Sequence, residues 1–378
     1  MINIVRTKKD QRELDVWLLV SAFILTAIGL GAVYSASLTR SLAIYSDRYY
    51  IIRSQIFWIV IGSLSLGITI NFDHRYYANF ARYFLIFTVI LMIFVFIPGL
   101  SHQVGKAKRW VKIGVMAFQP SELAKISLVM YLADLFSRKE DKINNFKYVF
   151  LPALVVTGSL IILTLLQSNL GTAVILFFIG LILFFAAGIP LKQMFFVFLS
   201  FLPVLVFAIT RETYRIKRIF AYLNPWLYPD TLGYNIIQSW KAFYNGGLMG
   251  VGWGKSIQKV GLLPAPHTDF IMAILAEEIG LLGVLIVMIL FIIILFRGCY
   301  ISTHSHNLFS KLLALGLTFM IFLQAAVNMA VVTGLLPTTG LVLPFISYGG
   351  SSMLVNMSSI GILLNIHRSN VLIEGDKI

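Results

Sequence analysis

Long apolar stretches separated by shorter polar segments dominate the hydropathy pattern of this chain. Ten of these stretches, which we call windows, are about 20 residues long, the length that an α-helix needs to cross a bilayer. They lie at residues 15–37, 52–70, 83–99, 119–136, 150–167, 170–188, 192–210, 270–296, 309–333 and 341–366. A helix satisfies its own backbone hydrogen bonds, as lipid requires. The pattern therefore predicts an all-α fold, a polytopic membrane bundle of about ten transmembrane helices.

The composition agrees with this class of protein. Of the 378 residues, 58% are hydrophobic and 12% are charged, and the mean hydropathy is +0.87. Ten apolar segments in a soluble fold would leave too little polar surface for water. The net charge of +14 would suggest nucleic acid in a soluble protein, but in a membrane bundle its placement matters more. We expect no nucleic-acid partner.

One connection is much longer than the others. Residues 211–268 separate the seventh and eighth windows, within what we expect to be a single integral membrane domain spanning residues 1–378. This stretch is rich in glycine, tryptophan and tyrosine. Glycine permits tight turns, and the two aromatic residues suit a membrane interface. A folded extracytoplasmic loop is therefore expected rather than a disordered linker.

The orientation follows from the charges that flank the first window. Arg6, Lys8, Lys9 and Arg12 precede it, so the positive-inside rule places the N-terminus in the cytoplasm. No convincing cleavage site follows, and we expect the first helix to remain as an anchor. Ten spans return the C-terminus to the same side. The single cysteine, Cys299, excludes an intramolecular disulfide and a cysteine-ligated metal.

Basic residues gather in two connections that this topology places outside, against the positive-inside rule. They are Lys106, Lys108, Arg109 and Lys112 in the third-to-fourth connection, and Arg211, Arg215, Lys217, Arg218, Lys241, Lys255 and Lys259 in the long loop. Contact with phospholipid headgroups is one interpretation. Arginine and lysine also suit phosphate oxygens, so a pyrophosphate-linked lipid is the other. Arg109, Lys112 and Lys259 are candidate substrate-binding residues.

Few of the 16 acidic residues can serve chemistry on the outer side. Asp269 follows a Pro-containing loop and precedes a long apolar run, so it should lie at the water-lipid boundary where a helix begins. Glu122 and Lys125 share neighbouring faces of the fourth helix and are expected to form an intramembrane ion pair with a structural or positioning role. Glu277 and Glu278 suggest either a proton relay or a role in helix packing or partner contact.

Several motifs together resemble the SEDS family of shape, elongation, division and sporulation proteins. The matching runs cover nearly the whole chain: Lys108–Trp110, Gln119–Leu123, Gln167, Gly171–Thr172, Gln238–Ser239, Gly246–Gly247, Leu263–Pro264, His267–Phe270, Glu277–Glu278, Gly334–Gly340 and Pro344–Ser352. The runs Tyr34–Ser37, Ser256–Lys259 and Ser351–Ser352 are more similar to the division branch, FtsW, than to the elongation branch, RodA.

This resemblance implies a peptidoglycan glycosyltransferase of the bacterial cytoplasmic (inner) membrane. It implies lipid II as the substrate, a class B penicillin-binding protein as a transpeptidase partner, and other membrane proteins of the divisome or elongasome. Asp269 is the candidate general base, because a positioned carboxylate can accept a proton from a sugar hydroxyl. His267, Gln238 and Ser239 are candidate substrate-binding residues. A divalent cation, Mg²⁺ or Mn²⁺, is a candidate cofactor, although no metal ligands are assigned.

Two other functions remain compatible with the sequence. Buried charges such as Glu122, Lys125 and Glu277 would also suit a lipid flippase or transporter. A scaffold that binds and activates its partner is the third hypothesis. The absence of an obvious inverted repeat, together with the outward acid and its basic neighbours, favours chemistry at one face.

Overall fold

The computed structural model describes residues 14–99, 101–104, 107–113, 116–231, 233–259 and 263–375. Arg6, Lys8, Lys9, Arg12 and Lys106, on which parts of the charge argument depend, lie outside the described residues. Within the described ranges, ten long helices make up the bundle: α1 (Val16–Tyr45), α2 (Tyr50–Asn71), α3 (Arg75–Phe94), α4 (Pro120–Arg138), α5 (Leu151–Leu166), α6 (Leu170–Ala186), α7 (Leu191–Thr210), α10 (Ile271–Thr303), α11 (Leu308–Val332) and α12 (Gly350–Gly375).

The predicted fold class is confirmed: the chain is an all-α polytopic membrane bundle, and each predicted window overlaps one long helix. By length and composition, seven helices in the described part of the chain could cross a membrane. They are α1, α2, α3, α7, α10, α11 and the helix formed by α5 with the preceding π-helical turn Phe146–Phe150. The apolar α6 is shorter. Helix α4 carries buried charges and lies in the interior of the bundle.

Two predicted windows were misplaced along the chain. Helix α3 begins at Arg75 rather than near residue 83, and α12 begins at Gly350 rather than near residue 341. The segment from Leu341 to Gly349 is apolar and largely buried but forms a loop that contains Pro344. Hydropathy reports burial, and it cannot distinguish a buried loop from a helix.

A small antiparallel sheet between α3 and α4 was not predicted. Strands β1 (Ser101–Val104), β2 (Ala107–Ile113) and β3 (Met116–Phe118) pair in the order β1-β2-β3. The alternation along β2, where Val111 is buried and Lys112 is exposed, is the period-two signal of a strand. The sheet holds the side chains of this connection in a defined arrangement.

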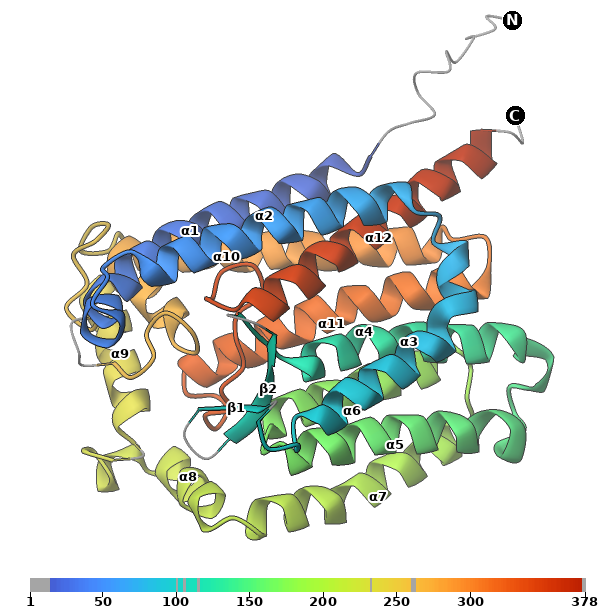
Figure 1. Ribbon diagram of the computed structural model, residues 1–378, viewed down its shortest axis with the longest axis horizontal. Coiled ribbons are helices and arrows are strands. Elements are labelled where there is room, and N and C mark those ends of the chain that lie inside the picture. Colours follow the sequence, from blue (N-terminus) through green and yellow to red (C-terminus); the bar gives the residue numbers. More distant parts are fainter. Residues whose placement is uncertain are drawn as a thin grey trace, which may run out of the picture.

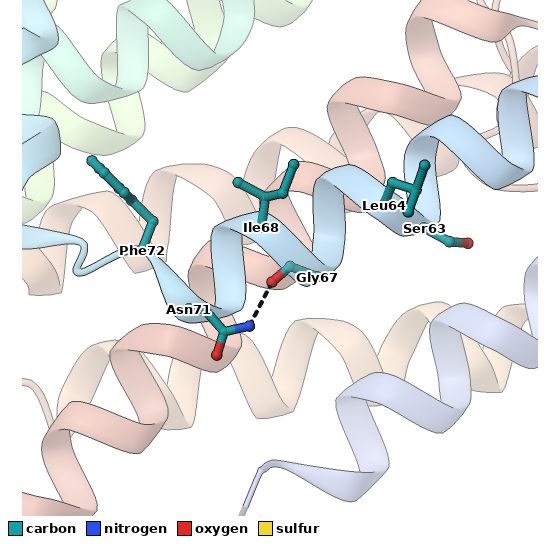
Figure 2. A pocket seen from close by; sticks show the side chains of 6 residues that line it. All are labelled: Ser63, Leu64, Gly67, Ile68, Asn71 and Phe72. Atoms are coloured by element: carbon teal, nitrogen blue, oxygen red, sulfur yellow. Dashed lines mark hydrogen bonds between the residues drawn. The ribbon is translucent and has the colours of Figure 1, made fainter.

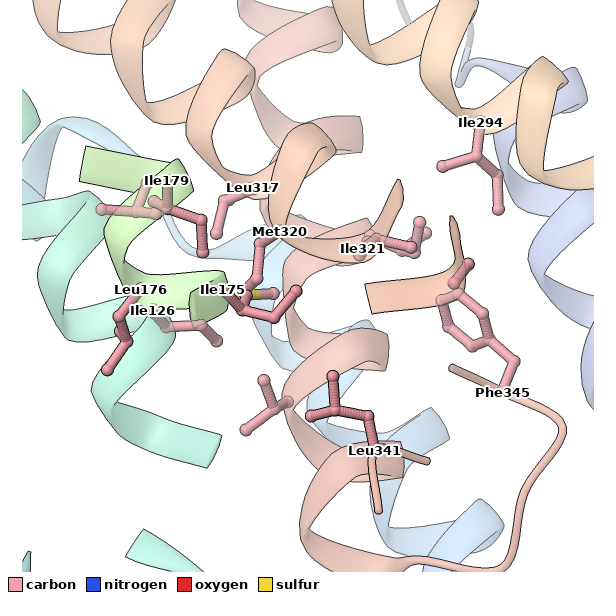
Figure 3. Close-up of a cluster of buried hydrophobic side chains, with 14 of the residues drawn as sticks. Ile126, Ile175, Leu176, Ile179, Ile294, Leu317, Met320, Ile321, Leu341 and Phe345 are labelled. Atoms are coloured by element: carbon pink, nitrogen blue, oxygen red, sulfur yellow. The ribbon is translucent and has the colours of Figure 1, made fainter. Parts of the chain in front are cut away.

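Helix α11 lies at the centre of the packing, against α4, α6 and α10. Figure 3 shows Leu317, Met320 and Ile321 of α11 among isoleucine and leucine side chains of the neighbouring elements. Each of these three side chains is fully buried. Helix α7 lies instead at the edge of the bundle (Figure 1), where few of its residues are buried. The core that holds the site is thus built around α11.

Helix α10 is broken close to its start. Gly280 has φ 70° and ψ −172°, so the helix is interrupted after a first segment that ends at Ile279. Residues 247–252 of the preceding loop pair with the break through hydrogen bonds from the backbone N–H of Val251 to the carbonyl of Glu277 (2.9 Å) and from that of Leu281 to the carbonyl of Gly247 (2.9 Å). These bonds satisfy backbone groups that the interrupted helix cannot.

The two ends of the bundle differ in what they carry. Helix α1 begins and α12 ends at the same end (Figure 1). The long connection includes α8 (Thr213–Leu223) and α9 (Tyr234–Gly246), which lie toward the other end, where α1 ends and α10 begins. Charged side chains of the loops therefore meet the first segment of α10 at that end.

Candidate functional site

The backbone of Asp269 is fixed between two helices. Asp269 directly precedes Phe270, the residue that caps α10. Asn328 of α11 donates one amide hydrogen to the Asp269 carbonyl (3.1 Å) and another to the carbonyl of Leu341 (2.6 Å). Gly340 has φ 72°, and a Cβ there would lie 3.4 Å from Asp269 Oδ2. The loop before α12 thus passes directly beside the carboxylate.

The residues before Asp269 are tied to the same loop. The Ser347 hydroxyl donates to the Thr268 carbonyl (2.6 Å), and the Tyr348 N–H donates to the His267 carbonyl (2.9 Å). The rings of His267 and Tyr348 lie 5.7 Å apart, and Tyr348 Oη is 3.1 Å from Ser54 Oγ on α2. The site loop is therefore held by α2, α11 and the loop before α12.

His267 is a neutral side chain in this environment. It is buried, and this burial, together with the charge of Arg40, lowers the pKa of His267 to about 4. Its Nδ1 atom is buried without a hydrogen-bond partner within the described residues. A neutral ring suits an orienting role better than proton transfer at neutral pH.

Three guanidinium groups act on the carboxylate of Asp269, which is half-buried. Burial raises the pKa of Asp269 above its ordinary value. The charge of Arg109, the hydrogen bond from Thr268, and the charges of Arg218 and Arg40 oppose this effect without cancelling it. A carboxylate with a raised pKa is a stronger base than an exposed one, and its basic surroundings suit an anionic ligand.

Two of these arginines come from the elements that carry the predicted basic clusters. Arg109, on β2, donates to the Ser168 carbonyl, and its Nε atom is buried without a partner among the described residues. Burial lowers the pKa of Arg109, although a guanidinium stays charged in proteins. Arg218, on α8, donates to the Thr338 carbonyl (3.0 Å). Both cations are thus anchored near Asp269 and keep further donors for a ligand.

Two other predicted ligands occupy different places. Lys112 lies three residues after Arg109 on β2, beyond the β-bulge that leaves Arg109 without a partner in β1, and its side chain is exposed. Lys259 donates its ammonium hydrogens to Glu278 Oε1 (3.0 Å), Ser35 Oγ (2.7 Å) and the carbonyl of Gly254 (2.6 Å). All three donors of Lys259 are therefore used inside the protein, whereas the sequence had suggested that they meet substrate.

Gln238 and Ser239 lie on the buried face of α9. The Ser239 hydroxyl donates to the carbonyl of Val332 at the end of α11 (2.6 Å), and Trp240 Nε1 donates to the carbonyl of Thr333 (3.0 Å). These bonds dock α9 onto the end of α11. Ser239 thus has a partner within the protein, and its substrate-binding role stays a prediction, as does that of Gln238.

The expected ion pair between Glu122 and Lys125 is present in α4. Lys125 Nζ lies 2.9 Å from Glu122 Oε2, and both side chains are buried. The Lys125 ammonium also donates to Gln324 Oε1 on α11, whose amide donates to the Val342 carbonyl (2.9 Å). The pair therefore joins α4 to α11 and to the loop that passes beside Asp269.

Two pockets open elsewhere on the bundle. One, of about 660 Å³, lies along α2 and is lined by Ser63, Leu64, Gly67, Ile68, Asn71 and Phe72 (Figure 2). The other, of about 540 Å³, is an apolar space between α2, α3, α4 and α12.

The described residues contain no group of three or more His, Cys, Asp or Glu side chains that could hold a metal ion.

Arg40 was missed as a site residue by the sequence analysis. It lies in α1 beyond the end of the first predicted window, in the part by which α1 exceeds that window. Its charge acts on both Asp269 and His267. Arg40 lies far in sequence from Asp269 and His267, and nothing in the sequence indicated that it would be close to them. Arg218 was recognised only as one basic residue among many in the long loop.

Comparisons with known proteins agree with this arrangement over nearly the whole chain. The family model described as "Cell cycle protein" (FtsW, RodA and SpoVE) matches residues 16–371. A probable peptidoglycan glycosyltransferase FtsW from Geobacter sulfurreducens is 39% identical, covering 97% of this chain and 98% of the relative. Stage V sporulation protein E from Bacillus subtilis is 36% identical, covering 94% of this chain and 97% of the relative.

Solved structures show the same fold. A chain from a study of a peptidoglycan synthase complex that coordinates polymerization and crosslinking superposes with a TM-score of 0.77 at 26% identity, covering 94% of this chain and 98% of that chain. The rod shape determining protein RodA from Thermus thermophilus superposes with a TM-score of 0.71 at 25% identity, covering 94% of this chain and 97% of that chain. This chain therefore belongs to the FtsW, RodA and SpoVE family of cell cycle proteins.

Proposed function

We propose that this chain is a peptidoglycan glycosyltransferase that polymerises lipid II, with Asp269 as its general base. The observation that carries the proposal is the environment of Asp269. Its carboxylate is half-buried, has a raised pKa and is acted on by the charges of Arg109, Arg218 and Arg40. The same place holds a group that can accept a proton and groups that can stabilise a pyrophosphate. The names of the relatives add support.

The chemistry is a displacement at the anomeric carbon of the donor sugar. The acceptor sugar hydroxyl attacks this carbon, and its proton passes to the Asp269 carboxylate as the new glycosidic bond forms. The bond between the anomeric carbon and the pyrophosphate oxygen breaks, and the leaving group takes its electron pair. Arg109 and Arg218 stabilise the negative charge that develops there. Such a direct displacement inverts the anomeric configuration.

We propose a divalent cation only as one that binds together with the substrate pyrophosphate. Asp269 offers one carboxylate among several arginines, so the protein alone supplies few oxygen ligands. Magnesium is often held by one or two carboxylates together with substrate phosphates. A cation that arrives with the pyrophosphate would fit this donor set and would help neutralise the leaving group. Activity would then fall on addition of a chelator.

Partners and location complete the proposal. The similar chain from a peptidoglycan synthase complex supports a class B penicillin-binding protein as the transpeptidase partner, within the larger set of divisome or elongasome proteins. The higher identity to FtsW relatives than to RodA favours a division role over an elongation role. We place the multi-pass bundle in the bacterial inner membrane with both termini in the cytoplasm.

The test is glycan polymerisation from purified lipid II. Wild type, Asp269→Asn and the exposed control Asp141→Asn are purified, each with the partner carrying an inactivated transpeptidase site. Wild type and the control should form polymer, while Asp269→Asn should be slower by about 10²–10⁴-fold. Burial disfavours the charged form of Asp269, so Asn should not lower stability at neutral pH.

Two results would overturn the proposal. Equal polymer from wild type and Asp269→Asn would remove Asp269 from the mechanism. Transport of labelled lipid II across vesicles by the wild type, without polymer under conditions where the protein is folded, would instead favour a flippase.

A further inference from the structure

Two adjacent carboxylates are buried where α10 breaks. Glu277 and Glu278 are 0% and 1% exposed, and both residues closely precede the interruption at Gly280. A buried carboxylate is costly unless hydrogen bonds or an opposite charge compensate it. The hydrogen-bond partners of these two residues therefore show which segments of the chain are joined at the break.

Glu277 binds the long loop. Its Oε1 atom accepts from Asn245 Nδ2 of α9 (3.2 Å), and its Oε2 atom accepts from the Ser256 hydroxyl and from the backbone N–H of Gln258 (3.2 Å). Its backbone carbonyl accepts from Val251 (2.9 Å). One residue of α10 thus fixes the end of α9 and two separate parts of the loop that follows.

Glu278 joins three segments. Its Oε1 atom accepts from Lys259 Nζ of the loop (3.0 Å) and from the Ser35 hydroxyl of α1 (2.5 Å). Lys259 also donates to Ser35 Oγ (2.7 Å), which closes a triangle of contacts. The Lys259 side chain is 13% exposed and that of Glu278 is 0% exposed. Such a shielded pair is screened less than a surface ion pair.

Glycines fix the same joint through the backbone. A Cβ on Gly246 would lie 1.9 Å from the carbonyl oxygen of Ala276, and a Cβ on Gly250 would lie 2.2 Å from that of Glu278. At both positions only a residue without a side chain permits the observed contact. The loop and the first segment of α10 are therefore packed backbone against backbone, so that a shift of one moves the other.

This joint involves the helix that begins beside Asp269. Lys259 of the loop binds Glu278 of α10, and Asp269 directly precedes the capping residue of the same helix. Helix α1, which supplies Ser35, also carries Arg40, whose charge acts on Asp269. The Lys259–Glu278–Ser35 contacts thus set the position of the proposed base relative to one of its neighbouring cations.

We propose that Lys259 and Glu278 form a positioning clamp for the Asp269 carboxylate. Neither residue is proposed to touch substrate. The clamp fixes the α10 segment, the long loop and α1 together, and a displacement of about 1 Å at a reacting group can cost on the order of a hundredfold in rate. The inference rests on the proposed function, because Asp269 must be the base for its position to limit the rate.

The test compares Lys259→Met, Glu278→Gln and the double variant with wild type, in full-length protein with its partner. Lys192→Met and Glu140→Gln are the matched controls, because both residues are exposed and are distant in sequence from Lys259 and Glu278. Polymerisation rates are measured against lipid II concentration and pH, with thermal unfolding in detergent as a fold check. Asp269→Asn is assayed in parallel.

A clamp predicts that each single variant lowers kcat by about ten- to a hundredfold and leaves KM within about twofold of wild type. The kcat of the double variant should be no lower than that of the single variants, because both changes break the same contact. Loosening also changes the exposure of Asp269 and its distance from Arg40, both of which set its pKa, so the acid limb of the pH–rate profile shifts. A purely structural role would lower the rate at every pH without moving the limb, and that result would overturn the clamp.

Other results overturn it in different ways. A raised KM in Lys259→Met, with Glu278→Gln near wild type, would make Lys259 a substrate ligand instead. Wild-type kcat in both single variants would remove the clamp while leaving the proposed function intact, provided that Asp269→Asn is inactive. An active Asp269→Asn protein would instead refute the proposed function itself.

Discussion

Replacing Lys125 with methionine should destabilise the bundle more than removing both charges of its ion pair. The Lys125 and Glu122 side chains are 1% and 4% exposed, and Nζ lies 2.9 Å from Oε2. Lys125→Met leaves the Glu122 carboxylate buried with no compensating cation. Breaking a buried pair in this way typically costs about 3–5 kcal/mol. Methionine has nearly the shape of the lysine stem, so packing changes add little.

The double variant Glu122→Gln/Lys125→Met removes the uncompensated charge. The glutamine amide introduced in place of the Glu122 carboxylate can then donate to Gln324 Oε1, which loses its lysine donor in both variants. Replacing a buried ion pair with well-packed neutral groups is often neutral. We therefore expect the double variant to lose no more than about 1 kcal/mol.

The measurement is equilibrium unfolding in detergent micelles at neutral pH, followed by circular dichroism, for wild type and both variants. Lys192→Met, at an exposed lysine on α7, serves as the control and should match wild type. Equal losses in the single and double variants would refute the reasoning, because the cost would then come from the lost lysine contacts and not from a buried charge.

Two further outcomes follow from the structure. Gly280→Ala should destabilise by about 1–3 kcal/mol or more, because alanine is strained at φ 70°, ψ −172° and its Cβ would lie 2.4 Å from the Gly250 nitrogen; Gly158→Ala, with nothing within 4 Å, is the control in the same unfolding assay. Polymerisation should fall as pH falls through the raised pKa of Asp269, since the base must be deprotonated. A rate that stays constant down to the ordinary aspartate range, near about pH 4, would contradict that assignment.

Hydropathy predicted the bundle because lipid leaves few alternatives for a long apolar segment. All ten windows correspond to helices. The ends of the windows were predicted less accurately. The loop from Leu341 to Gly349 is as apolar as a helix because it packs against α11 and the site. Its backbone groups are satisfied by side chains such as those of Asn328 and Ser347, and a hydropathy window carries no information on such partners.

The candidate base could be predicted, and its surroundings could be predicted only in part. Asp269 is visible as an acid between a Pro-containing loop and an apolar run. The sequence could not show which basic residues lie near Asp269 and which are paired inside the protein, as Arg40 and Lys259 illustrate. Charge alone does not reveal the contacts of a lysine or arginine side chain. The structure pairs Lys259 with Glu278 and leaves Arg40 exposed on the side of His267 and Asp269.

The way in which buried cations are partnered separates two kinds of charge in this bundle. Lys125 and Lys259 bind side chains of the protein from more than one helix, and such charges join elements. Arg109 binds one carbonyl and retains a buried Nε donor without a partner within the described residues. An unpaired buried donor costs stability unless another group completes its bonding. Because Arg109 is also the strongest cationic influence on Asp269, a cation that the protein leaves incompletely paired lies near the proposed base, as the proposed binding of a pyrophosphate requires.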